Sequence, residues 1–217
     1  SIAAAMDCEG SIQYELTFVG MWTAEYHPGA WIEQATFSPM VVAAHSAAYT
    51  MWALGGIATD GIEQVAESGM TALLAGELGA LAGTSVGDYT IADGPLAMGG
   101  EGSFSVKVTL TNAYSYLSMV TMLAPSPDWI TGVSGIDMCD RTTGQWKEMQ
   151  TANAYPVDAG TDSGMTFMAE DIDTMPRDPI ALLGEQFGDP EQVNPVAYVS
   201  IAAAMDCEGS IQYELTF

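Results

Sequence analysis

Two stretches decide the fold of this chain: APSPDWITGVSGIDMC at residues 124–139 and DAGTDSGMTF at residues 158–167. In the first, two prolines stiffen a turn that presents Asp128 ahead of an apolar run, and the run at 130–138 reads as a short strand. In the second, Asp158 and Asp162 lie four residues apart in a loop whose glycines allow tight folding. Both stretches therefore combine strand-forming residues with acidic turns.

The three aspartates of these turns are a candidate calcium site. Calcium takes six to eight hard oxygens, which several carboxylates, backbone carbonyls and water supply together. Asp158 and Asp162 can face one point, with Asp128 brought in from the neighbouring loop. Clusters of Asp, Gly and Ser are also ordinary turn chemistry, and the residues alone favour that simpler interpretation.

Outward from these stretches, the chain reads mainly as short strands separated by turn residues. Residues 11–19 alternate polar and apolar side chains, which is typical of a strand with one buried face. Such spacing of short strands predicts an antiparallel β-sandwich that carries helical insertions. Further strands are predicted at residues 88–91, 104–110, 117–123, 165–168 and 196–204.

The clearest helical pattern covers residues 60–81. Asp60 and Glu63 resemble a capping box at its start, and apolar residues follow at helical spacing. Gly69 and Gly76 weaken this helix and are the places where it would divide. The apolar stretch 41–54 fits either a helix or a buried strand.

Charge narrows the possible partners. The 217-residue chain has 28 acidic and 4 basic residues, for a net charge of −24. Such a surface repels nucleic acid and anionic membranes, and no apolar run reaches the roughly 18 residues needed to span a bilayer. The sequence therefore predicts a single, non-membrane domain with neither of these partners.

Catalysis is not expected. A hydrolase would need His27 or His45, but no GxSxG nucleophile elbow, phosphate-binding loop or dinucleotide fingerprint is present. His27 precedes a proline and reads as a loop residue, whereas His45 lies in an apolar run and reads as a hydrogen-bonded core histidine. The fourteen methionines read as flexible core fillers.

The two quoted stretches closely resemble the signature segments of the spondin domain, an adhesion module of extracellular matrix proteins. Upstream pieces fit as well: residues 14–18, Trp22-Thr23, His27-Pro28 and FSPMVVAAHSAAYTMWALGGIATDGIEQVAESG at 37–69. Their order and spacing hold over about residues 8–180. The resemblance implies a secreted or cell-surface antiparallel β-sandwich with a calcium ion held by Asp128, Asp158 and Asp162.

The resemblance also implies a disulfide that joins Cys139 to the cysteine ahead of the first strand. That cysteine is Cys8 or its copy Cys207, and the sequence leaves this choice open. The chain departs from the animal members of the family because it is far more acidic and lacks their accompanying adhesion repeats. Binding to integrins or microbial glycans is therefore not carried over.

The stretch SIAAAMDCEGSIQYELTF occurs twice, at residues 1–18 and 200–217. The offset of 199 residues is about one spondin domain, which predicts tandem repeats with 1–6 as the end of a preceding unit, 7–205 as the sandwich and 206–217 as the start of the next. Either each unit is complete and abuts its neighbour, or a terminal strand is donated to a neighbouring unit.

These observations predict an extracellular, non-enzymatic, calcium-binding structural module that repeats or polymerises into a fibre or surface assembly, with copies of itself as partners. The alternative is a monomeric adhesion module that recognises a glycan or a protein through the calcium-side loops and an exposed Trp129.

Overall fold

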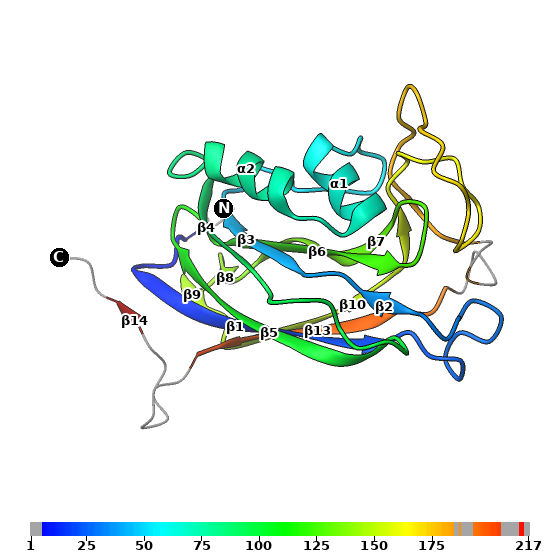
Figure 1. The fold of residues 1–217 in the computed structure, drawn as a ribbon. Helices are drawn as coiled ribbons and strands as arrows, with labels where there is room; N and C mark the ends of the chain where they lie inside the picture. Colours follow the sequence, from blue (N-terminus) through cyan, green and yellow to red (C-terminus); the bar gives the residue numbers. More distant parts are fainter. Residues whose placement is uncertain (1–5, 185–186, 188–192, 205–212, 215–217) are drawn as a thin grey trace.

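The chain folds into two antiparallel sheets stacked face to face, with two helices on the outside of one sheet (Figure 1). The computed structural model describes residues 6–184, 187 and 193–204, and the backbone of 213–214. The predicted mainly β fold with helical insertions is therefore confirmed.

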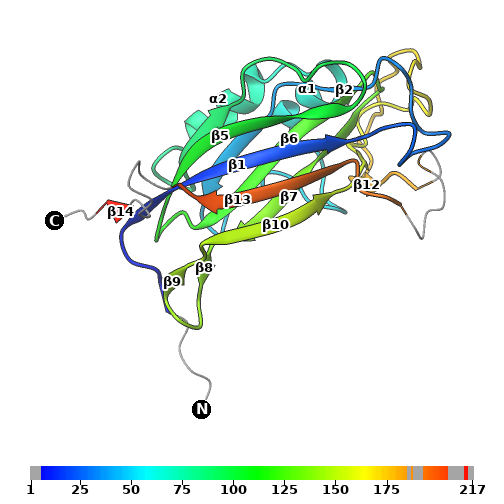
Figure 2. The same cartoon turned by 90° about the horizontal axis from the view of Figure 1, so that it is seen from below.

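The first sheet has the strand order β10–β13–β1–β5, visible side by side in Figure 2. Strand β5 pairs with the whole length of β1, and β13 pairs with its other edge from Tyr14 to Gly20. A short strand, β14 (Tyr213–Glu214), pairs with Ser11 and Ile12 at the start of β1. The long strands are β1 (Ser11–Met21), β5 (Glu101–Thr111), β10 (Met149–Ala154) and β13 (Ala197–Ala203).

The second sheet has the order β12–β11–β7–β6–β3–β4, with β2 also paired to β6. A separate hairpin, β8 (Cys139–Asp140) with β9 (Gln145–Trp146), follows β7. The strands of the second sheet are β2 (Thr36–Phe37), β3 (Val41–His45), β4 (Val86–Ile91), β6 (Tyr116–Ala124), β7 (Trp129–Asp137), β11 (Val157–Asp158) and β12 (Ala181–Leu182).

The main core lies between the two sheets. Every second residue of β1 is buried there, as the alternation predicts. Phe18 of β1 meets Phe37 of β2 edge to face, with ring centroids 4.9 Å apart. Burying one such side chain stabilises the fold by about 1.5–3 kcal/mol. The buried β1 side chains include Ile12, Tyr14, Leu16 and Phe18.

A second core lies between the outer face of the second sheet and the helices α1 (Asp60–Ser68) and α2 (Ala72–Ala80). Because both faces of this sheet are covered, all five residues of β3 are buried. The stretch 41–54 thus begins as a doubly buried strand, which explains why its uniformly apolar pattern could not distinguish helix from strand.

The predicted helix at 60–81 is two helices. It breaks at Gly69, whose φ of 68° is left-handed, a conformation that glycine adopts without steric cost. The predicted capping box is wrong by one residue, because Thr59 is the N-cap and accepts the Ile62 N–H. Glu77 of α2 accepts hydrogen bonds from Thr59 Oγ1 and Gly61 N, at 2.7 Å each, and so joins the two helices.

The strand predicted at 165–168 is wrong. These residues lie in a loop that includes a bend and a turn; Phe167 packs against the main core, whereas Met165 and Met168 are exposed. The sequence reading also missed β10, whose residues MQTANA are mostly polar or small. Strand β10 is an edge strand of the first sheet, paired to β13, and its alternate side chains are exposed, so its sequence need not be apolar.

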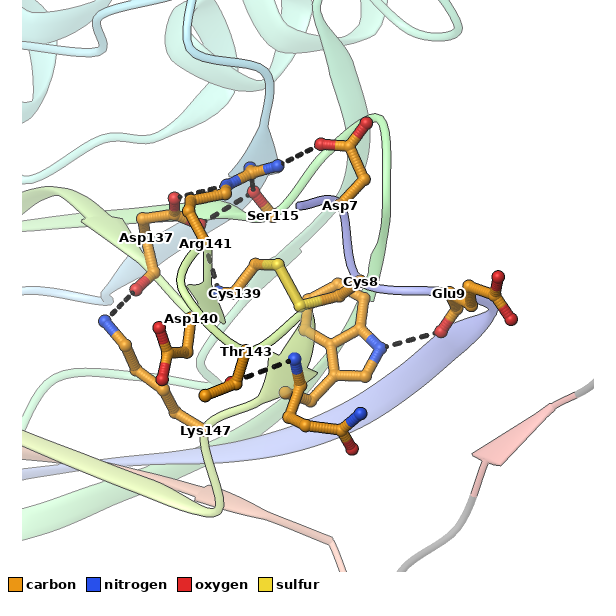
Figure 3. The surroundings of a disulfide bond; sticks show 12 residues. Asp7, Cys8, Glu9, Ser115, Asp137, Cys139, Asp140, Arg141, Thr143 and Lys147 are labelled. Carbon is orange, nitrogen blue, oxygen red and sulfur yellow. Dashed lines mark hydrogen bonds and ion pairs between the residues drawn. A yellow bond between two sulfur atoms is a disulfide. The ribbon is translucent and has the colours of Figure 1, made fainter. Parts of the chain in front are cut away.

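A disulfide joins Cys8, ahead of β1, to Cys139 in β8, with Cα atoms 5.8 Å apart (Figure 3). Beside it, the Arg141 guanidinium donates to Asp7 Oδ1 at 2.5 Å and to Asp137 Oδ2 at 2.9 Å. Cys207, the other candidate partner, lies outside the described residues. The bridge therefore fastens the entry to β1 onto the end of β7, 131 residues away in sequence.

Candidate functional site

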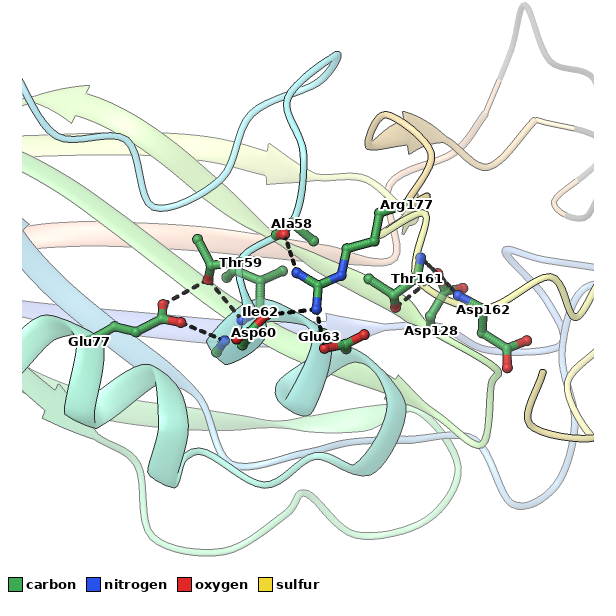
Figure 4. Close-up of polar contacts among 11 residues, drawn as sticks. Ala58, Thr59, Asp60, Ile62, Glu63, Glu77, Asp128, Thr161, Asp162 and Arg177 are labelled. Carbon is green, nitrogen blue, oxygen red and sulfur yellow. Dashed lines mark hydrogen bonds and ion pairs between the residues drawn. The ribbon is translucent and has the colours of Figure 1, made fainter. Parts of the chain in front are cut away.

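Asp128 lies buried at the turn that enters β7. Trp129 N donates to Ser126 Oγ at 3.0 Å, which shapes this turn. Asp128 Oδ2 accepts the backbone N–H groups of Thr161 at 2.7 Å and Asp162 at 3.1 Å (Figure 4). The structure thus brings the Asp128 turn directly against the loop that holds the other two aspartates.

The second oxygen of Asp128 is unusual. Asp128 is fully buried, yet its Oδ1 has no hydrogen-bond partner. Burial raises the pKa of Asp128 above its ordinary value, because a charged carboxylate is poorly solvated there. A buried acceptor left unsatisfied costs about 1–3 kcal/mol, so a hydrogen-bond donor or a cation at this oxygen would stabilise the fold.

Asp158 is an acidic neighbour of Asp128. Burial, and then repulsion from Asp128, raise the pKa of Asp158 to about 6. Its Oδ1 accepts a local hydrogen bond from Gly160 N at 2.8 Å. Two mutually repelling carboxylates with an unsatisfied oxygen between the loops form an arrangement that a hard cation would stabilise.

Asp162 is arranged differently. Its Oδ1 accepts the Gly164 N–H and its Oδ2 accepts the Ile172 N–H, so both oxygens bind the backbone of its own loop. The side chain extends away from Asp128 in Figure 4. Within the described part of the chain, no three His, Cys, Asp or Glu side chains stand together as a metal cluster. The structure therefore places Asp158 beside Asp128, and directs the Asp162 carboxylate to the backbone of its own loop.

An acidic cleft of about 290 Å³ opens above this loop, and Asp158, Asp162 and Asp178 line it. Gly160, also in the lining, has a φ of 73°, and an added Cβ would lie 2.2 Å from Asp178 O. Only glycine fits this close approach. The donor chemistry of the cleft is carboxylate and backbone oxygen, which fits calcium, with water completing the coordination.

Sequence reasoning missed Glu67. This residue of α1 hydrogen-bonds Thr161, and its Oε1 is buried without a partner. Burial first, partly offset by the Thr161 hydrogen bond, raises the pKa of Glu67. Glu67 follows Glu63 by four residues, a spacing that places both on one face of the helix. The sequence does not show the contact with Thr161 that brings Glu67 to the site.

Arg177 was missed as well. Its guanidinium donates to Ala58 O at 2.8 Å and to Asp60 Oδ1 at 2.7 Å, and it also binds Glu63 (Figure 4). It therefore ties the aspartate loop to the start of α1. The Arg177 guanidinium is thus paired with acidic residues of α1 rather than with Asp128 or Asp158.

The two histidines are hydrogen-bonded to neutral groups. His45 ring nitrogens contact Ser46 O at 2.9 Å and Ser118 Oγ at 2.8 Å, and His27 Nε2 contacts Pro195 O at 3.2 Å. Burial lowers the pKa of both rings. These are the contacts of core and loop histidines, as the sequence predicts.

The expectation of an exposed Trp129 is wrong. This side chain is 1% exposed and meets the Phe167 ring edge to face, with centroids 5.0 Å apart. It therefore closes the core beneath the loops and cannot contact a ligand at the surface.

Residues 12–198 match the family model of the spondin amino-terminal domain. This chain belongs to the spondin family. Spondin-2 of Homo sapiens is 32% identical over 171 residues, covering 77% of this chain and 51% of that protein. Spondin-1 of Bos taurus is 33% identical over 177 residues, covering 79% of this chain and 22% of that protein.

The chain thus spans about half the length of Spondin-2 and about a fifth of Spondin-1. These spondin relatives are secreted proteins of the extracellular matrix and are not known as enzymes. Among the described residues, no helix is long and apolar enough to cross a membrane.

Proposed function

We propose that this spondin domain is an extracellular, calcium-binding structural module of the adhesion type, which repeats or polymerises into a fibre or surface assembly. The proposal that the domain binds calcium rests on the buried Oδ1 of Asp128, which has no hydrogen-bond partner and lies beside Asp158. The observation that carries the repeating part is the duplicated eighteen-residue segment.

Calcium would be held by Asp128 and Asp158, with Asp162 joining them if its carboxylate leaves the Gly164 and Ile172 N–H groups. The ion would supply positive charge where two carboxylates repel each other and would fasten the β7 turn to the aspartate loop. Because the bound ion favours the folded state, it would stabilise the domain by mass action.

The duplicated segment supports repetition because part of it already works as a strand. Ser200–Ala203 form the end of β13 and pair with Thr17–Tyr14 of β1. Residues 1–4 have the same sequence, so they carry the same side chains for completing the last strand of another unit. The identical copies can occupy identical positions, which permits abutting units or exchanged strands.

Calcium titration with calorimetry tests the first part. The wild-type domain is expected to bind calcium, and both Asp128→Asn and Asp158→Asn are expected to weaken binding at least about tenfold. Asp93→Asn, at an exposed position outside the cleft, is the charge-matched control and should bind normally. Equal binding by all four proteins would contradict the proposed site.

Mass and particle shape under non-reducing conditions, with and without a chelator, test the second part. Filaments, or masses well above the 22.8 kDa chain, are expected. Loss of the assemblies on chelation would make calcium part of the joint, whereas their survival would confine it to single domains. A compact monomer in both conditions would contradict assembly and leave the alternative, a monomeric adhesion module for a glycan or protein.

A further inference from the structure

The loop at residues 163–176, here named the methionine loop, projects beyond the sandwich at the right of Figure 1. Four apolar side chains within it are largely exposed: Met165 at 66%, Met168 at 78%, Ile172 at 54% and Met175 at 80%. Core-filling, the role the sequence reading gave to methionine, does not describe them. Several exposed large apolar side chains close together in one loop are typical of an interaction surface.

The methionine loop is anchored at both ends and in its middle. Ser163 N donates to Ile172 O at 3.0 Å, and Thr174 N donates to Thr161 O at 2.8 Å, which closes the loop on itself. Phe167 packs against Trp129 and Trp22, with ring centroids 5.0 and 5.7 Å apart. The loop therefore presents its methionines from a fixed backbone, so a partner need not order it on binding.

The charge of the loop is entirely negative. Glu170, Asp171 and Asp173 are exposed between the methionines, and residues 163–176 contain no Lys or Arg. The adjacent Arg177 is occupied by Asp60 and Glu63. The surface thus combines flexible apolar side chains with unbalanced carboxylates.

We propose that the methionine loop is a docking surface for a cationic, amphipathic segment of a partner protein. Unbranched methionine side chains adapt to varied apolar partners, and the carboxylates would pair with Lys or Arg beside that apolar face. A second copy of this chain is a poor occupant of this loop because its four Lys and Arg residues cannot form a cationic face, and its net charge of −24 repels an anionic bilayer.

Methionine-methyl NMR of the whole domain tests this directly. The probe is a synthetic helical peptide of about five turns with Leu and Trp on one face and Lys on the other. The methyl signals of Met165, Met168 and Met175 are expected to shift on titration. Met70, Met98 and Met149 are comparably exposed, at 57%, 74% and 62%, and should stay unchanged as internal controls.

Two matched triple variants measure how much the methionine side chains of the loop contribute to the affinity for the peptide. Replacing Met165, Met168 and Met175 by Ser is expected to raise the peptide Kd at least about tenfold. The control triple Met70→Ser, Met98→Ser and Met149→Ser removes comparable exposed apolar surface and should change Kd less than about twofold.

Neutralising the loop carboxylates measures how much their negative charge contributes to the affinity for the peptide. Glu170→Gln, Asp171→Asn and Asp173→Asn together should weaken binding about tenfold and reduce its salt dependence. A peptide with Glu in place of Lys should not bind the wild type.

The proposal is overturned if the peptide does not bind at about 1 mM, or if both methionine triples weaken it equally. It is also overturned if vesicles of phosphatidylcholine shift the loop methyls while the peptide does not, since the occupant would then be lipid. The same titration in chelator separates the loop from the calcium site, because the docking surface requires neither calcium nor repetition.

Discussion

The two ends of strand β7 handle their carboxylates in opposite ways. At its end, Asp137 accepts hydrogen bonds from Arg141 and from Cys139 N, beside the disulfide. Before its start, Asp128 is buried against Asp158, and its Oδ1 has no partner. The Asp137 carboxylate is therefore satisfied within the fold, whereas the Asp128 carboxylate keeps one oxygen that a cation would stabilise.

The pKa values of the carboxyl groups shift in opposite directions at the two ends of β7. Burial alone would raise the pKa of Asp137, but hydrogen bonds from Arg141, Cys139 N and Ser115 together hold it below its usual value. At the other end, burial and the charge of Asp128 raise the pKa of Asp158 to about 6. A carboxylate is therefore a stabilising group at one end of β7 and a destabilising one at the other when no cation is bound.

The largest expected effect comes from breaking the covalent tie. Cys139→Ser should lower the free energy of unfolding by about 4 kcal/mol, because the bridge closes a loop of 131 residues. Urea unfolding under non-reducing conditions measures this loss. Cys207→Ser is the matched control and should leave stability unchanged, whereas an equal loss would mean that the second copy carries the bridge instead.

Two glycine-to-alanine substitutions, one in the aspartate loop and one in β7, test the close backbone approach in the aspartate loop. Gly160→Ala should destabilise the aspartate loop by about 3 kcal/mol, since the residue combines a φ of 73° with a Cβ position 2.2 Å from Asp178 O. Gly135→Ala in β7 has a similar φ of 67° but nothing within 4 Å of its Cβ, and should cost about 1 kcal/mol. Equal melting temperatures of the two variants would refute the close approach.

Removing the cation that satisfies Asp137 should have a smaller effect. Arg141→Ala is expected to cost about 1–2 kcal/mol at neutral pH, with Arg141→Lys intermediate because it loses the planar fork. The folded-state pKa of Asp137 lies below its unfolded value, so this contribution is present at neutral pH and is lost as pH falls below about 4. Unfolding curves at pH 7 and well below pH 4 should show the variants converging on the wild type as the pH falls; a constant difference would contradict the ion pair as its source.

The smallest expected effect is at Asp158, and it has the opposite sign. Its folded-state pKa of about 6 lies above the unfolded value, so in chelator the wild type should lose about 1 kcal/mol as pH rises from about 4 to 6, after allowance for solvent exposure. Asp158→Asn should remove that loss, and calcium should abolish it in the wild type. Identical pH profiles of the two proteins in chelator would contradict the repulsion between Asp158 and Asp128.

The residues of the candidate site were only partly predictable from the sequence. The sequence predicted that Asp158 and Asp162 could face one point with Asp128 brought in from a neighbouring loop, and the structure places the Asp128 carboxylate against that loop. The sequence did not predict that both carboxylate oxygens of Asp162 accept backbone N–H groups, or that Glu67 forms a hydrogen bond with Thr161. Side-chain direction in a loop depends on which N–H groups face it, and spacing does not encode this.

The sequence by itself determined the mainly β architecture, the strand character of residues 11–19 and the helical character of residues 60–81, because side-chain periodicity is a local property of the chain. It also determined the family through long segments in a fixed order. Only the tertiary structure decided that Trp129 is buried, that β3 is covered on both faces and that the methionine loop stays exposed. Burial depends on what packs against a segment from elsewhere in the chain, and that neighbour is absent from any local pattern.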